Sequence, residues 1–102
     1  MIIKNDFLIL LYEVANEVGQ ELDNRKSGEI GIGSVEDLEF IFIELSSLAS
    51  SLIDSSSKPS PERKYLKSAG IVMESWPAQE DLSERICMID YLYRNELTIS
   101  DS

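Results

Sequence analysis

Few side chains in this sequence could perform catalysis. The 102 residues include no histidine and one cysteine, Cys87. Without a histidine base, neither a serine nor this cysteine has the group that usually activates a nucleophile, and no lysine is obviously buried beside a serine. Cys87 lies between Ile86 and Met88 on a predicted helix, which favours a buried structural thiol over a reactive one. We therefore predict that the protein is not an enzyme and carries no cofactor.

Carboxylates at helical spacing are the remaining catalytic candidates. Glu36 and Glu39 form a Glu-x-x-Glu pair, which resembles half of the Mg²⁺-binding motif of helical nucleoside triphosphate pyrophosphohydrolases. The second half would be another such pair downstream, but neither Glu62 nor Glu84 is followed three positions later by an acid. Di-iron chemistry in a helical bundle needs histidines as well. The sequence therefore disfavours this enzyme class, and we expect no metal site.

The charge of the chain indicates a partner more than a reaction. Asp and Glu number 19 against 9 Lys and Arg, and the net charge is −10. Residues 1–57 hold eleven acids and three bases (net −8), whereas residues 58–102 hold eight acids and six bases (net −2). Such a field repels nucleic acid and anionic membranes and speeds encounter with a cationic surface. The alternative is that the charge serves solubility alone.

The elements that position these residues are four amphipathic helices. Apolar spacings of three and four predict helices over residues 6–24, 35–53, 61–76 and 78–95. Expected N-caps are Asn5 or Asp6 for the first helix, Ser34 for the second, and Ser60 followed by Pro61 for the third. A Gly-rich loop is predicted at about 27–34, a Ser/Pro-rich loop at about 54–60 and a polar tail at 98–102. The prediction is a single all-α domain, 1–102, folded as an up-and-down four-helix bundle.

One apolar stripe on each helix is predicted to form the core. In chain order the stripes are Phe7, Leu11, Val14, Ala15, Val18 and Leu22; Leu38, Ile41, Phe42, Leu45, Leu48, Ala49 and Leu52; Tyr65, Leu66, Ala69, Val72, Met73 and Trp76; and Leu82, Ile86, Ile89, Leu92 and Tyr93. Opposite the first stripe, Glu13, Glu17 and Glu21 fall four apart, where like charges destabilise a helix slightly. This row is either a solvated face or a functional one.

Two large apolar residues lie off their stripe among acids. Phe40 and Ile43 are flanked by carboxylates on the second helix, and either protrude into solvent or belong to a wide core face. If they protrude, they would anchor a protein partner, with the acids steering its approach. The predicted partner-binding face comprises Tyr12, Glu13, Glu17, Glu36, Asp37, Glu39, Phe40 and Ile43.

Location can also be predicted from the sequence. The N-terminal apolar run, Phe7 to Leu11, is too short for a signal-peptide core or a membrane span. A lone cysteine cannot form an internal disulfide, which fits a reducing compartment. We predict a cytoplasmic protein that binds neither membranes nor, for want of a basic stripe, nucleic acid directly.

Size, acidity, helical content and the missing catalytic residues together resemble the immunity proteins of bacterial toxin systems, of the contact-dependent growth inhibition or nuclease-colicin type. The segment from Ser83 to Cys87 is similar to a helical stretch of a colicin immunity protein. The resemblance implies tight binding to a cognate toxin, expected to be a basic tRNase or DNase domain, through an acidic surface that imitates a phosphate backbone. The alternative is an antitoxin-like, adaptor or regulatory bundle that binds another protein or forms a homodimer through Phe40 and Ile43.

Overall fold

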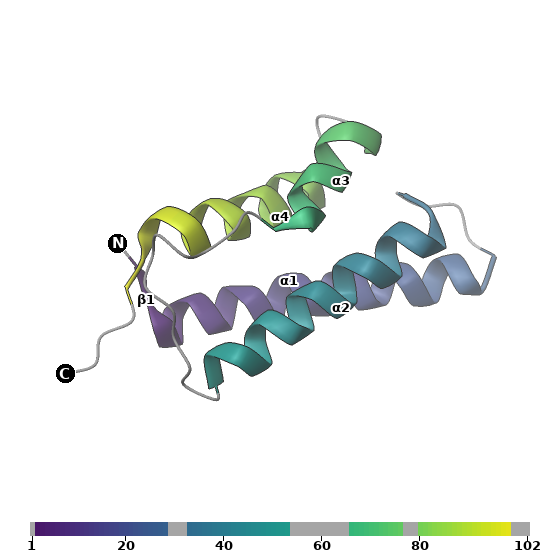
Figure 1. Cartoon of the computed structure of the whole chain (residues 1–102). Helices are drawn as coiled ribbons and strands as arrows, with labels where there is room; N and C mark the ends of the chain where they lie inside the picture. The colour runs from purple at the N-terminus through teal and green to yellow at the C-terminus, as the bar shows by residue number, and fades with distance from the viewer. Residues whose placement is uncertain (1, 29–32, 54–65, 77–79, 99–102) are drawn as a thin grey trace.

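Four α-helices form the body of the protein, which confirms the prediction of an all-α four-helix bundle (Figure 1). The computed structural model describes residues 2–28, 33–53, 66–76 and 80–98. The helices are α1 (Lys4–Lys26), α2 (Val35–Ile53), α3 (Lys67–Ser75) and α4 (Asp81–Tyr91), and α4 continues into a π-helical turn, η2 (Leu92–Glu96). Two-residue strands, β1 (Ile2–Ile3) and β2 (Leu97–Thr98), lie at the two ends of this chain.

Neighbouring helices run antiparallel, in the up-and-down order. α1 starts and α4 ends at the same end of the molecule (Figure 1), where β1 and β2 pair in parallel with Ile2 opposite Leu97. This strand pair was not predicted from the sequence, because two residues are too short to show an alternating pattern. The pair joins the start of α1 to the segment that follows α4.

The core lies along the predicted stripes. Its buried hydrophobic residues are Phe7, Leu11, Val14, Ala15, Val18, Leu22, Leu38, Ile41, Leu45, Leu48, Ala49, Leu52, Leu66, Ala69, Val72, Trp76, Leu82, Ile86, Ile89 and Leu97. Each large side chain among them contributes about 1.5–3 kcal/mol through the apolar area it removes from water. Leu92 and Tyr93 are partly buried against this core.

Two residues predicted to lie in the core are exposed instead. Phe42 is 37% exposed and Met73 is 75% exposed. Phe42 lies at the edge of its stripe and covers Gly19 of α1 from outside, with its ring 3.2 Å from the position a Cβ atom would take. Met73 follows Val72 on the short helix α3, which buries Ala69 and Val72 and leaves Met73 to solvent. Tyr65, also predicted for the core, lies outside the described residues.

Of the helix N-caps predicted from the sequence, one is confirmed and one is wrong. Ser34 caps α2 as predicted, its Oγ accepting a hydrogen bond from the backbone N–H of Asp37 at 3.1 Å. The prediction that Asn5 or Asp6 caps α1 is wrong, because the N-cap is Ile3, which makes no side-chain cap bond. β1 holds Ile3 in an extended conformation, and the helix begins at the next residue.

The starts of the last two helices differ from the predicted ones. Ser60 and Pro61, the expected start of the third helix, lie outside the described residues, and α3 begins at Lys67. The fourth helix was predicted from 78, but α4 begins at Asp81, with Glu80 as its N-cap. Residues 77–79 lie outside the described part of the chain.

Candidate functional site

The exposed side of α2 carries the group of residues that best fits a protein-binding site. Glu36 precedes Glu39 by three residues and Phe40 by four, and Ile43 follows Glu39 by four and Phe40 by three, so the four residues share one side of the helix. Phe40 is 41% exposed and Ile43 is 62% exposed. We call these four residues the α2 patch. Their exposure resolves the choice left open by the sequence, since neither apolar side chain is absorbed into the core.

The opposite side of α2 explains why the patch faces outward. Leu38, Ile41 and Leu45 are completely buried, which fixes the rotation of the helix about its axis and turns the remaining positions to solvent. The patch is only partly free of intramolecular partners, because Glu39 Oε1 lies 3.9 Å from Lys26 Nζ of α1. Asp37, also predicted for the binding face, is half-buried in the first turn of the helix and borders the patch.

The predicted residues of α1 do not join the α2 patch. Glu17 accepts a hydrogen bond from Arg85 of α4, and Glu13 Oε2 lies 4.0 Å from Nη2 of the same arginine. These carboxylates therefore face α4. Tyr12 is 51% exposed and precedes Gly19 by two helical turns, so it lies on the side of α1 nearest to α2. The eight predicted residues thus occupy three separate parts of the surface.

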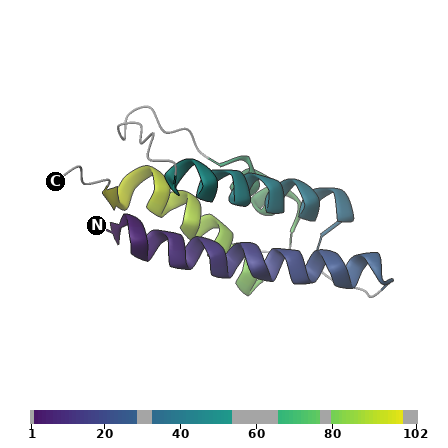
Figure 2. The ribbon, with the colours of Figure 1, turned by 90° about the horizontal axis from the view of Figure 1, so that it is seen from below.

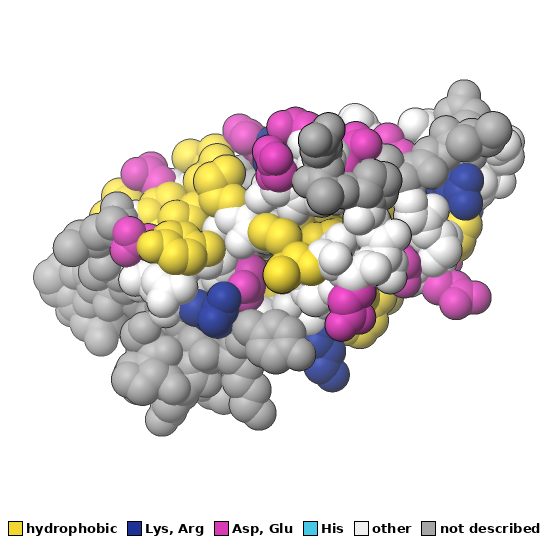
Figure 3. Space-filling view, turned by 90° about the horizontal axis from the view of Figure 1, so that it is seen from above, with side chains coloured by type: hydrophobic (Ala, Val, Ile, Leu, Met, Phe, Trp, Pro, Cys, Tyr) yellow, Lys and Arg dark blue, Asp and Glu magenta, His cyan; other side chains and the backbone are white. Residues whose placement is uncertain are grey.

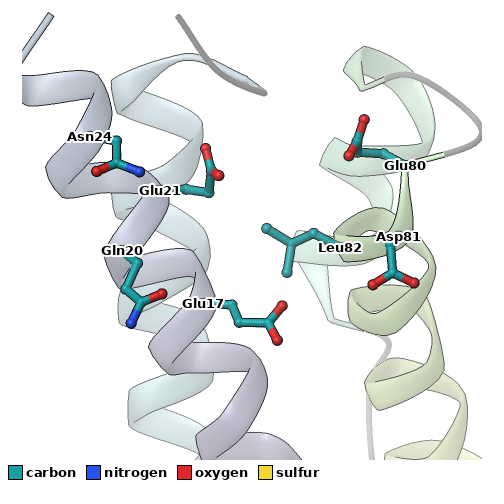
Figure 4. A pocket seen from close by; sticks show the side chains of 7 residues that line it. All are labelled: Glu17, Gln20, Glu21, Asn24, Glu80, Asp81 and Leu82. Carbon is teal, nitrogen blue, oxygen red and sulfur yellow. The ribbon is translucent and has the colours of Figure 1, made fainter. Parts of the chain in front are cut away.

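An acidic groove that the sequence did not predict lies between α1 and α4. It encloses about 250 Å³ and is lined by Glu17, Gln20, Glu21, Asn24, Glu80, Asp81 and Leu82. In Figure 4, Leu82 points from α4 toward α1, and Glu17 points across the groove from the other side. The four-residue spacing of the α1 acids was visible in the sequence, but the second wall depends on which helix packs beside them.

Arg85 neutralises part of the negative charge between α1 and α4. The hydrogen bond to Glu17 raises the pKa of the guanidinium, burial opposes that rise, and the nearby charges of Glu17, Asp81 and Glu13 add to it. Arg85 is therefore permanently charged, and its side chain is only 26% exposed. Its position between the carboxylates of two helices makes it a structural cation of the bundle.

The chemistry of Cys87 agrees with a structural thiol. Burial raises the pKa of the thiol, and the negative charge of nearby Asp90 raises it further. A raised pKa keeps the sulfur protonated near neutral pH, and the thiol is a poor nucleophile in that form. Cys87 is half-buried against the core, so the predicted burial is only partial.

The described part of the chain contains neither a cluster of metal-binding side chains nor a helix that could span a membrane. No three His, Cys, Asp or Glu side chains within residues 2–28, 33–53, 66–76 and 80–98 gather so that they could hold a metal ion. Among these same residues, every helix is too short or too polar to cross a membrane.

Seen from the side of α3 and α4, acidic side chains lie in a row along one edge of the molecule (Figure 3). Hydrophobic side chains gather in groups beside them, and few lysines or arginines interrupt the row (Figure 3). Acidic surface therefore extends over several helices and is not confined to α2. No protein-family model, curated protein or solved structure matches this chain.

Proposed function

We propose that this protein is an immunity protein that binds and neutralises a bacterial toxin, whose active domain is a basic tRNase or DNase. The proposal rests on a chain of net charge −10 without histidine, together with the resemblance described above. Bound to the nuclease, the acidic protein would exclude nucleic acid by occupying its cationic surface. Such a partner gains from electrostatic steering, which speeds encounter between oppositely charged proteins.

The observation that carries the proposal is the composition of the α2 patch. Tight protein interfaces draw most of their energy from a few apolar or aromatic anchors, while surrounding charges set the association rate and the selectivity. Phe40 and Ile43 would be the anchors, and Glu36 and Glu39 would be the steering charges. Two apolar side chains flanked by acids would fit a nuclease whose substrate-binding surface is basic.

A non-catalytic adaptor, antitoxin-like or regulatory bundle is the second candidate. The exposure of Phe40 and Ile43 would serve any protein partner with an apolar pocket. The two candidates differ in genetic context: an immunity gene lies beside a reading frame that ends in a basic nuclease domain. Co-purification with the product of the neighbouring gene, followed by a nuclease assay, distinguishes them.

The anchor is tested by truncation. Phe40→Ala should weaken toxin binding by about 2 kcal/mol, mainly through faster dissociation. Met73→Ala is the matched control, since Met73 is 75% exposed and lies on α3. Surface plasmon resonance gives both rate constants, and the melting temperature of each free variant shows whether the fold is intact. Equal binding by wild type and Phe40→Ala would remove Phe40 from the interface.

The steering charges are tested by reversal. Glu36→Lys combined with Glu39→Lys should slow association, and the effect should shrink as salt screens the charges. Glu74→Lys combined with Glu84→Lys changes the net charge equally at exposed positions of α3 and α4, and should slow association less. If both pairs slow association by the same factor, only the net charge matters and the α2 patch is not the binding site.

A further inference from the structure

The contact between α1 and α4 shows how acids on a helix of this protein bind a cation. Arg85 of α4 lies across two carboxylates of α1 that are four residues apart. One guanidinium nitrogen donates a hydrogen bond to Glu17, and Nη2 lies 4.0 Å from Oε2 of Glu13. Leu82 and Ile89 lie about one helical turn to either side of Arg85, and both are buried. An arginine together with neighbouring apolar side chains therefore holds α4 on α1.

The α2 patch presents acids and apolar side chains of the same kind on an exposed surface. Glu36 and Glu39 are three residues apart on α2, which places their Cβ atoms about 5–6 Å apart, and both are exposed. Phe40 follows Glu36 by four residues, and Ile43 follows Glu39 by four, so one helical turn separates the acids from the apolar side chains. The patch lacks only a cation that bridges its two acids.

Lys26 contacts the acids of the patch only loosely. Figure 2 shows α1 and α2 running alongside each other, and the end of α1 brings Lys26 Nζ to 3.9 Å from Glu39 Oε1. This distance is too long for a hydrogen bond, and the two side chains are 55% and 49% exposed. An exposed ion pair of this kind contributes little free energy. Since Lys26 is the last residue of α1, its side chain can turn away without moving a helix.

An arginine fits these acids better than a lysine does. The guanidinium is planar and has N–H donors on different nitrogens, so it can bond two carboxylates at once, as Arg85 does on α1. The ammonium group of a lysine is a compact, strongly hydrated charge. Charge-assisted hydrogen bonds of about 2.7–2.9 Å would replace the 3.9 Å contact between Lys26 and Glu39.

We infer that the α2 patch binds an amphipathic helix of the toxin that carries an arginine and, one turn away, a large apolar side chain. The arginine bridges Glu36 and Glu39 in place of Lys26, and the apolar side chain packs on Phe40 and Ile43. A helix lying alongside α2 matches the spacing of the patch, because both have a pitch of about 5.4 Å. The inference rests on the proposed function, in which the partner is a basic nuclease.

Charge complementarity selects this occupant. The two acids attract a cationic segment, and the net charge of −10 repels an acidic one, including a second copy of this chain. The apolar side chains of the patch favour a segment that is itself amphipathic over a purely basic one, since their burial supplies most of the binding energy.

NMR titration of the purified full chain with synthetic peptides tests the inference without the toxin. The probe is a helical peptide based on alanine and glutamine, with one arginine and a leucine four residues later. Two analogues replace the arginine by lysine or by citrulline, which keeps the shape but lacks the charge. In about 50 mM NaCl the arginine peptide should bind at least about fivefold more tightly than the lysine peptide, and the citrulline peptide should bind most weakly. The backbone amide signals of Phe40 and Ile43 should shift on binding.

Two pairs of substitutions locate the bound arginine. Glu36→Gln combined with Glu39→Gln should abolish the preference for arginine over lysine. Glu21→Gln combined with Glu80→Gln is the matched control, because it removes the same charge from the groove between α1 and α4. This control pair should change the affinity for the arginine peptide by less than about twofold. Circular dichroism checks that the variants stay helical.

The displacement of Lys26 is tested in the same titration. Lys26→Gln should strengthen binding of the arginine peptide about twofold to threefold, because it removes the competing cation. The gain should disappear in the presence of Glu39→Gln if Lys26 acts through that carboxylate. Lys67→Gln removes the same charge at an exposed position of α3 and is the control. An equal gain for Lys67→Gln would mean that net charge alone acts, and would overturn the exchange of Lys26 for an arginine.

Three results would overturn the arginine-bearing helix as the occupant of the patch. The arginine peptide does not bind, it binds no better than the lysine peptide, or its advantage survives Glu36→Gln with Glu39→Gln. None of these results removes the proposed function, which fails by a different observation: a neighbouring nuclease that does not co-purify with the chain.

Discussion

At the scale of single residues, Gly33 occupies a conformation and a space that other residues cannot share. Its φ of +73° lies in the left-handed region, where a side chain costs roughly 1–2 kcal/mol. The indole of Trp76 lies against it, with Nε1 2.6 Å from the position of a Cβ atom. Trp76 is 6% exposed, so the indole has little room to move away. Gly33 therefore sets the contact between the start of α2 and the end of α3.

Gly33→Ala should lower the free energy of unfolding by roughly 2–4 kcal/mol, because backbone strain and a clash with the indole add. Gly28→Ala is the matched control: its φ of +93° is also left-handed, but nothing lies within 4 Å of its Cβ position. That variant should lose only the backbone part. Urea denaturation followed by tryptophan fluorescence measures both values. Equal losses would mean that the indole moves away freely.

At the scale of elements, α3 depends on its neighbours for its start. It has nine residues, a length at which an isolated helix is marginal in water, and its N-cap Leu66 offers no side-chain acceptor. Asp90 of α4 accepts a hydrogen bond from the Leu66 N–H at 2.6 Å. Glu44 of α2 accepts one from the Ser68 N–H at 2.7 Å and another from Lys67 N–H at 3.1 Å. Two helices thus supply the N-terminal caps of a third.

Glu44→Ala should release the first turn of α3. Losing an N-cap acceptor destabilises a helix by about 1–2 kcal/mol, which corresponds to faster hydrogen exchange of the α3 amides by about tenfold. Exchange in the middle of α1 should change less. Glu74→Ala removes an exposed acid of α3 itself and serves as the control. If exchange accelerates equally throughout the bundle, α3 unfolds only with the whole protein.

At the scale of the whole molecule, the acid excess is built into the contacts between helices. Acids of α1 and α4 face each other across the groove, and Arg85 is the cation placed between them. Repulsion between the acids on the two sides of the groove opposes the packing of α4 on α1. Arg85 offsets part of this repulsion. The bundle therefore combines a strongly negative surface with a helix contact at which the partly exposed Arg85 pairs with acids of the neighbouring helix.

Arg85→Gln should lower the free energy of unfolding by roughly 1 kcal/mol in low salt, since partly exposed ion pairs contribute modestly. Added NaCl should recover part of this loss, because it screens the acids left facing one another. Lys26→Gln makes the same change of charge at an exposed pair, Lys26 with Glu39 at 3.9 Å, and should lose about 0.5 kcal/mol or less. Thermal unfolding at two salt concentrations measures both. If salt does not reduce the loss in free energy of unfolding caused by Arg85→Gln, that loss comes from packing and not from repulsion between the acids.

Features that depend on residues close together in the chain could be predicted from the sequence. Spacings of three and four predicted the helices and most of the core, from Phe7 on α1 to Ile89 on α4, because helical periodicity sets which side chains can be buried together. Ser34 was predicted as a cap because its acceptor bonds a backbone N–H three residues away. The exposure of Phe40 and Ile43 was one of two alternatives, since periodicity does not set the width of the buried face.

Which flanks of the helices face each other depends on long-range packing and could not be predicted from the sequence. Glu44 and Asp90 cap a helix more than twenty residues away, and Arg85 binds Glu17 across 68 residues, so no local pattern reveals these roles. The same packing separates Glu13 and Glu17 from the α2 patch and places Tyr12 on the side of α1 nearest to α2. An amphipathic stripe specifies which side of a helix is buried, whereas the partner on each flank depends on the order in which the helices pack.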